Sequence, residues 1–410
     1  MSDAKSPLFN RTYLKIIVWI VAVAIVLLTA GQNSSSDFIR INKHPDLPLY
    51  YVDHDDTTVQ LSLLFRTGAA INSEQQLLQQ LLLQQAEQQL AELTKQPPFN
   101  TLNAALSAGI SADKLQISIT LPAKQAKADA IKTMAEQLLQ RLRAYHPGTD
   151  LEQRWTHLEA AQYLNLKDPE NRLLSTFGNL ISSPASIHPL QRFAEFFHHS
   201  VRPDAVTLTL KGPDTASLAE RLSSLLRAPS SDNHSINQPL SLSRQRLSPQ
   251  DNQTYRLLGL ALPGRQQPQF ATELLAVSTL QQLLQQQSQM NARLVWKSLD
   301  KQGFVAMILQ GSKINANDDL GPLMQTLLAK LDDRLINDTR DMLQNNYQIQ
   351  MEAIEPQLSL LNTIAFYQLP LDYLNNFEEK LNQVDNAEVK KQITLFLTSP
   401  GRYQLTLPAY

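Results

Sequence analysis

Short segments with the residue pattern of β-strands open the first half of the chain. Between positions 114 and 121, the apolar residues Leu115, Ile117 and Ile119 alternate with polar ones. A period of two residues places one face of a strand against a core. On such patterns, strands are predicted at 38–42, 49–53, 58–66, 114–121 and 205–210.

Longer segments between these strands have apolar residues three and four positions apart. The most distinctive runs from 73 to 95, where leucines alternate with eight glutamines between Gln75 and Gln89. Such a composition could indicate a disordered low-complexity tract, but the leucine spacing favours an amphipathic helix. Helices are predicted at 73–95, 123–145, 151–166, 169–181, 189–200 and 214–226, with a short one after Asn100.

A segment rich in Ser, Asn, Pro and Gln, residues 228–250, predicts a linker. Beyond it the order of strands and helix clusters repeats, which predicts two related α+β domains at 38–227 and 251–410. In the second domain the expected strands are 255–262, 304–311 and 403–407, and the expected helices are 269–287, 292–299, 319–335, 338–352, 357–367, 373–383 and 387–397.

An uncharged apolar run near the N-terminus, within residues 13–31, approaches the length that crosses a bilayer as a helix. Lys5, Arg11 and Lys15 lie at or before its start, so the positive-inside rule places residues 1–12 in the cytoplasm. We predict a single-pass inner-membrane anchor with a tether at 32–37 and the bulk of the chain in the periplasm. A cleaved signal peptide is the alternative, and the length of the apolar run favours the anchor.

Composition excludes some classes of function. The net charge of −2 leaves no basic excess to neutralise phosphates, so a nucleic-acid partner is not expected. The chain has no cysteine, which excludes a Cys-based zinc site, a disulfide framework and a thiol nucleophile. It also lacks the G-x-S-x-G, Walker and dinucleotide-binding motifs.

The order of strand, Gly68 and long helix resembles the insulinase, pitrilysin and mitochondrial-processing-peptidase family, and the resemblance covers nearly everything after Asp37. It implies two related α/β-sandwich domains of the insulinase-type metallopeptidase fold. Active members carry the inverted zinc motif H-x-x-E-H on that helix. Its positions fall here on Leu81, Gln84 and Gln85. Leucine cannot bind zinc, and a glutamine amide cannot accept the proton of a zinc-bound water.

Other family positions have also changed. Arg293, Leu294 and Gly303 match a family segment, but its substrate-contacting Arg and Tyr fall on Leu299 and Ala306. The loop at 109–113 lacks the family's Asn-Ala-x-Thr signature. Glu159 lies 74 residues after Gln85, near the place of the third zinc ligand. It could be a relic of that site, and an ordinary solvated carboxylate is the alternative.

The resemblance therefore implies a non-catalytic homologue with no metal and no cofactor. Its expected partner is an active metallopeptidase subunit of the same family, and an extended peptide could be held as an added strand. A stand-alone membrane scaffold is the alternative function. An enzyme with displaced ligands is a more distant hypothesis.

Overall fold

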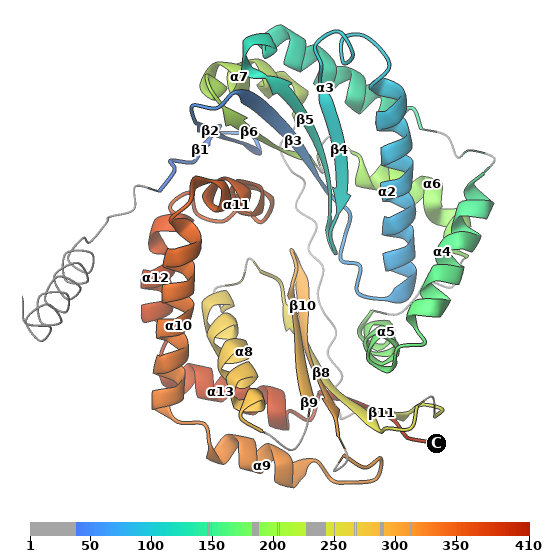
Figure 1. Cartoon of the computed structure of the whole chain (residues 1–410), viewed down its shortest axis with the longest axis vertical. Helices are drawn as coiled ribbons and strands as arrows, with labels where there is room; N and C mark the ends of the chain where they lie inside the picture. The colour runs from blue at the N-terminus through green and yellow to red at the C-terminus, as the bar shows by residue number, and fades with distance from the viewer. Residues whose placement is uncertain are drawn as a thin grey trace, which may run out of the picture. The chain divides into compact units, whose positions relative to one another are not determined.

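Two mixed β-sheets, one in each half of the chain, form the centre of the structure (Figure 1). This computed structural model describes residues 38–145, 148, 150–182, 188–202, 204, 206–226, 243–249, 251–265, 267, 269–287, 291–311 and 314–410. The predicted tail, anchor and tether at 1–37 lie outside these residues. None of the helices described is long and apolar enough to cross a membrane.

The first sheet has six strands, and all neighbours are antiparallel except the parallel pair β2 and β6. Its order is β1 (Asn42–Lys43), β2 (Leu49–Asp53), β6 (Val206–Gly212), β3 (Thr58–Arg66), β5 (Lys114–Pro122) and β4 (Ala105–Ile110). Strand β4 therefore lies at one end of the sheet.

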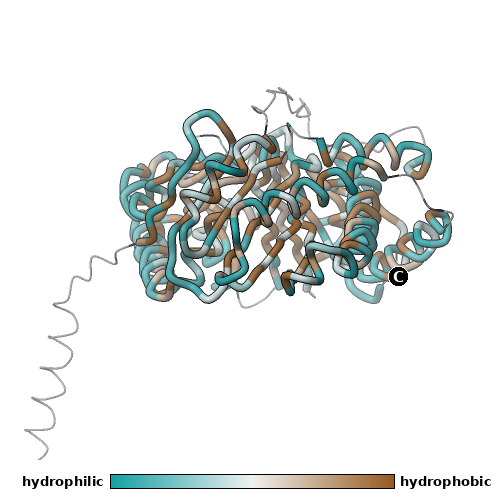
Figure 2. Tube along the Cα trace, turned by 90° about the horizontal axis from the view of Figure 1, so that it is seen from above, coloured by the Kyte–Doolittle hydropathy of each residue, from teal (hydrophilic) through white to brown (hydrophobic). Residues whose placement is uncertain are grey.

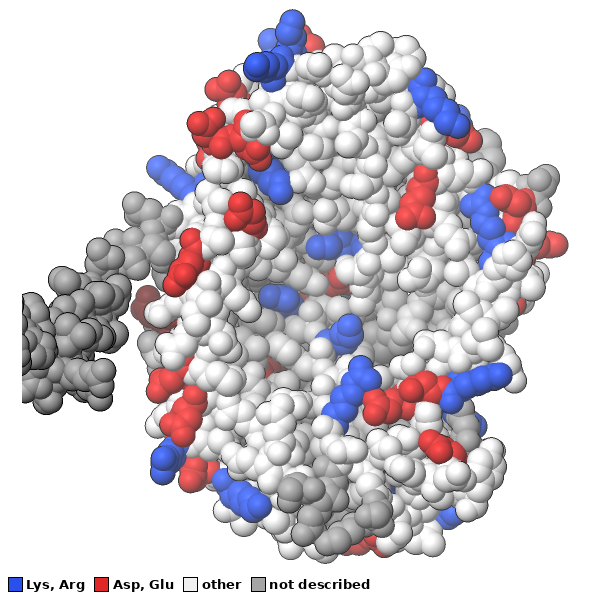
Figure 3. Space-filling model, viewed as in Figure 1, with Lys and Arg blue, Asp and Glu red and all other residues white. Residues whose placement is uncertain are grey.

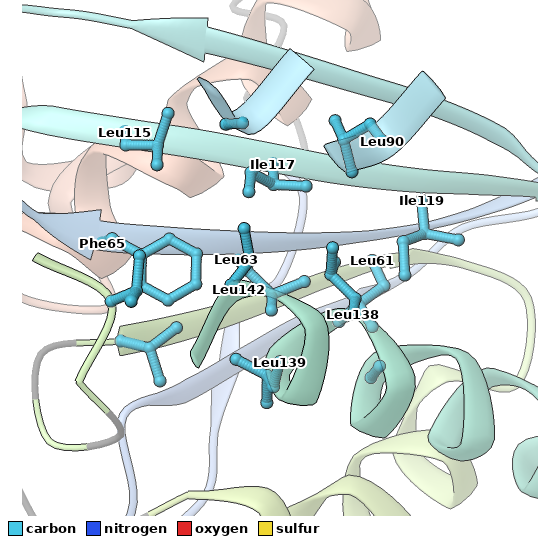
Figure 4. Packing of buried hydrophobic residues seen from close by; sticks show 14 of the residues in the cluster. Leu61, Leu63, Phe65, Leu90, Leu115, Ile117, Ile119, Leu138, Leu139 and Leu142 are labelled. Atoms are coloured by element: carbon cyan, nitrogen blue, oxygen red, sulfur yellow. The ribbon is translucent and has the colours of Figure 1, made fainter. Parts of the chain in front are cut away.

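The first half contains the helices α2 (Ser73–Leu93), α3 (Ala128–Arg143), α4 (Leu151–Asn165), α5 (Pro169–Ile181), α6 (Pro189–Ser200) and α7 (Thr215–Leu222), with short 3-10 turns at Ala123–Gln125 and Ser223–Leu225. Several of them, including α2, α3 and α7, pack on the first sheet. Figure 4 shows side chains of β3 and β5, including Leu63 and Ile117, packed with Leu90 of α2 and Leu138 of α3. The glutamine-rich tract is thus an ordered helix whose leucines build the core.

Helix α2 begins at a capping box. The Asn72 side chain accepts a hydrogen bond from the Gln75 backbone N–H at 2.8 Å, and the Gln75 side chain accepts one from the Asn72 N–H at 3.3 Å. This reciprocal pair satisfies two backbone donors at the helix start. It fixes the point where the chain leaves the Gly68 turn, which has a positive φ of 76°.

The second sheet repeats the order of the first without a counterpart of β1. Its strands, in spatial order, are β7 (Ser243–Arg246), β11 (Tyr403–Leu407), β8 (Tyr255–Pro263), β10 (Gln302–Gln310) and β9 (Asn291–Ser298). Only β7 and β11 are parallel. Its helices are α8 (Phe270–Gln285), α9 (Gly321–Ala329), α10 (Asp333–Met351), α11 (Ile354–Phe366), α12 (Tyr373–Asn382) and α13 (Asn386–Thr398). The predicted α+β class with a repeated arrangement is confirmed.

Each half contributes one helix to the sheet of the other half. Helix α5 packs on β8 and β11, while α11 packs on β2, β3 and β6. Phe177 of α5 is fully buried between Phe304 and Tyr403, with ring centroids 5.6 Å from each. Residues 39–410 consequently form one compact unit, and Figure 2 shows this hydrophobic interior from a second direction.

Three local predictions differ from the structure. Residues 292–299 were expected to be helical but lie largely in β9, because Leu294 and Trp296 face the core while Arg293 and Lys297 are exposed. The short helix predicted directly after Asn100 does not form, and turns at this place lead into β4. The predicted linker contains β7, which pairs with β11 and completes the second sheet.

Candidate functional site

Helix α2 buries two of its three expected catalytic positions, Leu81 and Gln85, whereas Gln84 is half-buried. Leu81 has no exposed surface and packs in the main hydrophobic cluster of the first half. Gln85, one helical turn later, is 3% exposed. Its side-chain oxygen accepts a hydrogen bond from Arg154 Nη1 of α4 at 3.2 Å. These positions therefore serve packing and helix contact.

Arg154 links α4 to α2 through several polar contacts. Besides Gln85, its Nη2 donates to Gln88 Oε1 at 2.5 Å, and its Nε donates to Asp150 Oδ2 at 2.8 Å. The hydrogen bond from Arg154 lowers the pKa of the Asp150 carboxyl. A guanidinium cation beside Gln85 would repel a divalent metal ion. Zinc chemistry has no suitable donor set at this place.

Gln79 holds the turn before α2, a role that the sequence pattern did not reveal. Its amide is 4% exposed and donates to Thr67 Oγ1 at 2.8 Å, to the Gly68 carbonyl at 3.0 Å and to the Ala112 carbonyl at 3.2 Å. The amide therefore joins the end of β3, the turn after β4 and the helix. Residue type alone gave no signal for this function.

Strand β4 presents an open sheet edge beside α2. It pairs with β5 alone among the described strands, and Ala105, Ser107 and Gly109 are exposed. The strand contains no charged residue and no proline. The alternation of these small residues with Leu106, Ala108 and Ile110 was the signal from which the strand could have been predicted.

The turn after β4 meets the turn between β9 and β10. The Asp300 backbone N–H donates to Asp113 Oδ2 at 2.9 Å, and the Tyr367 hydroxyl donates to the same atom at 3.0 Å. Asp113 is 3% exposed, and burial raises the pKa of its carboxyl against the lowering effect of these hydrogen bonds. This contact fixes the ends of the two hairpins against each other.

Three cations surround this contact. Arg66 Nε lies 3.5 Å from Asp300 Oδ2, and its Nη1 donates to Thr207 Oγ1 at 3.1 Å. Its guanidinium and the Lys114 amine lie 4.9 and 5.2 Å from the ring centroid of Phe366. The Arg265 guanidinium lies between two rings, 4.5 Å from Phe270 and 4.8 Å from Tyr367. Cation–π contacts of this kind stabilise partly desolvated charges.

Comparison with solved structures identifies the architecture. An inactive domain of an M16 peptidase from Pseudomonas fluorescens has a TM-score of 0.65 and 14% identity, covering 91% of this chain and 98% of that one. A protease from Helicobacter pylori has a TM-score of 0.60 and 10% identity, covering 90% of this chain and 100% of its own. The chain has the fold of the M16, or insulinase-type, peptidases. No family model matches the sequence, and no curated protein matches it in sequence.

The M16 proteins that it resembles differ in length. The chain matches the first half of the periplasmic protease PqqL from Escherichia coli with a TM-score of 0.58 and 13% identity, covering 91% of this chain and 92% of that half. It spans 47% of the whole PqqL chain and 43% of pitrilysin. Its length therefore corresponds to one half of these larger M16 chains.

The structure also shows where Glu159, the candidate relic of the third zinc ligand, lies. Glu159 is exposed on α4, whereas Arg154 of the same helix contacts Gln85. Across the described residues, no three His, Asp or Glu side chains lie close enough to hold a metal ion. The residues do not fit the zinc that the M16 fold implies.

The two expected catalytic positions of the second half, Leu299 and Ala306, are buried. Leu299 is 6% exposed at the β9–β10 turn, where its carbonyl accepts from the Arg265 N–H at 2.7 Å. Ala306 has no exposed surface and lies in the cluster formed with Phe177.

Proposed function

We propose that this protein is a non-catalytic M16-fold subunit that holds an extended polypeptide segment along β4 and acts beside an active metallopeptidase. The open edge of β4 is the observation that carries the proposal. The changes at Leu81 and Gln85 support the loss of chemistry, because a buried leucine and an arginine-bound glutamine cannot hold or activate a zinc-bound water.

An unprotected strand edge offers a row of unpaired backbone donors and acceptors. Proteins usually protect such edges with charged residues or proline. The end strand of the second sheet follows this rule, since β9 carries Arg293 and Lys297. Strand β4 has only Ala, Leu, Ser, Gly and Ile. Addition of a strand to such an edge binds a peptide through its backbone and needs no metal.

The size of the chain favours a paired arrangement. Because it matches one half of PqqL, a second M16-fold chain could supply the other half. We further propose that residues 13–31 anchor the protein in the inner membrane of a Gram-negative bacterium and that residues 38–410 lie in the periplasm. The uncharged N-terminal run and the basic residues around its start support this placement.

Photocross-linking in detergent-solubilised membranes tests the function. A photoreactive amino acid would replace Ser107 on β4, with Asn291 on the β9 edge as the matched control. We expect the Ser107 variant, and not the Asn291 variant, to form an adduct with an extended polypeptide. We also expect an M16-fold chain that retains H-x-x-E-H to co-purify with our protein, and removal of our protein to reduce that chain's peptidase activity. If no such adduct forms and the homologue is fully active alone, the stand-alone scaffold becomes the better hypothesis.

A further inference from the structure

We infer that the segment held along β4 carries acidic side chains at the end that lies beside Ile110. The inference rests on the proposed function, because it concerns the occupant of the same edge. It adds a chemical class to that occupant: an extended segment with Asp or Glu at one end and small or apolar residues along the rest.

The register of the sheet brings β4 to a group of cations. Gly109 lies opposite Gln116 of β5. Lys114 lies two residues before Gln116 in the same strand, nearer the turn between β4 and β5. Side chains alternate along a strand, so Gly109, Gln116 and Lys114 share one face. Arg66 of β3 lies opposite Lys114 and shares this face too. A strand added outside β4 would run along the same sheet, with Lys114 one strand and Arg66 two strands inside β4 at its Ile110 end.

The charges at this end are unbalanced among the described residues. Arg66, Lys114 and Arg265 gather around two carboxylates, Asp113 and Asp300. Both carboxylates already have partners, since Asp113 accepts from Tyr367 and from the Asp300 backbone, and Asp300 lies beside Arg66. One positive charge therefore exceeds the acidic charge within the cluster.

Neighbouring side chains add to this excess. Lys297 is exposed on β9, two residues before the Leu299 position in the same turn region. Figure 3 shows several Lys and Arg side chains, with Asp and Glu side chains among them, in the middle of the view. Burial lowers the pKa of Lys114; the Asp113 carboxylate acts against this shift, and repulsion by the charge of Arg265 acts with it. A carboxylate brought to this end would relieve that repulsion, whereas a basic segment would increase it.

The surface of β4 leaves room for such a segment. A Cβ atom added at Gly109 would meet no atom within 4 Å. The exposed neighbours Ala105 and Ser107 are equally small, so a second backbone can approach closely. The small or apolar side chains of the bound segment would lie beside these residues, while its acidic end would point towards the cations.

Three synthetic strand-forming peptides test the inference with the full-length protein in detergent. They share one sequence of alternating Thr and Val and differ only in two terminal residues, which are Glu, Gln or Lys; their C-termini are amidated. Fluorescence anisotropy measures binding. Each Glu that replaces a Gln should make the peptide bind about fivefold tighter. The Lys peptide should bind most weakly. The advantage of the Glu peptide should shrink as salt rises from about 50 to about 500 mM.

Two protein variants separate failure of the inference from failure of the proposed function. Lys297→Gln, an exposed substitution, and Lys114→Gln should each reduce the ratio of Glu-peptide to Gln-peptide affinity, measured on the same variant, by about threefold to fivefold. Ser107→Pro should abolish binding of all three peptides, and Asn291→Pro on the other edge should not. Equal binding of Glu and Gln peptides that still depends on Ser107 would overturn the acidic inference alone. Binding that ignores Ser107→Pro would overturn the proposed function as well.

Discussion

Gly259 on β8 lies against Phe177 from the other half of the chain, and its replacement by alanine tests the packing between the halves. An ideal Cβ at this position would lie 2.4 Å from Cε2 and 2.5 Å from Cζ of Phe177. Phe177 belongs to α5, which comes from the first half and covers the second sheet. The added methyl group must therefore displace a buried aromatic ring.

The size of the effect follows from overpacking. Phe177 has no exposed surface and is enclosed by Phe304 and Tyr403, so the ring cannot move without disturbing both. We expect Gly259→Ala to lower the free energy of unfolding by about 1–3 kcal/mol. Gly109→Ala is the matched control in another strand, because nothing lies within 4 Å of its added Cβ. It should be neutral or stabilising by up to about 1 kcal/mol.

Guanidinium unfolding, followed by circular dichroism and by tryptophan fluorescence, measures both variants. A double-mutant cycle gives the sharper result. Phe177→Leu removes part of the ring, so the Gly259→Ala/Phe177→Leu protein should be more stable than the sum of the two single effects, by about 0.5–3 kcal/mol. If Gly259→Ala unfolds at the wild-type midpoint, or if the two substitutions add without coupling, the packing of α5 on β8 is not as described.

Further expectations concern the metal, a buried carboxyl, the α2–α4 link and the anchor. The Leu81→His/Gln84→Glu/Gln85→His protein should carry no stoichiometric zinc in elemental analysis, because Arg154 lies beside position 85 and Glu159 is exposed; about one tightly bound zinc per chain would contradict this. Burial raises the pKa of Glu273 to about 7, from 4.5 for a free glutamate, so its contribution to stability is present below pH 4.5 and lost as the pH rises through 7. We expect the free energy of unfolding to fall by up to about 3 kcal/mol over that window and Glu273→Gln to lack the fall; identical pH profiles would count against it. Arg154→Ala should cost about 1–3 kcal/mol by leaving the buried Gln85 amide without its partner, whereas removal of the exposed Arg334–Asp338 pair should have little effect. Deletion of residues 1–32 should release a folded, soluble protein, and a mature N-terminus near Gly31 in the full-length protein would instead indicate a cleaved signal peptide.

The sequence alone determined the order of most elements and the class of fold. Leucine spacing predicted α2 despite its glutamines, because burial of one helical face depends on local periodicity. Composition likewise excluded cysteine chemistry. The replacement of zinc ligands at Leu81 and Gln85 is readable without coordinates, since a side chain without a donor atom cannot bind the metal in any fold.

Tertiary structure decided what the replaced positions now do. Arg154 reaches Gln85 across 69 residues of sequence, and Phe177 reaches Gly259 in the other half. Residues 292–299 show how context prevailed over local pattern, because pairing with β10 fixed them mainly as strand β9. The open edge of β4 and the cations near its end depend on which strands and turns meet. Contacts between distant segments follow from the packing of whole helices and strands, and a local pattern of residues does not predict them.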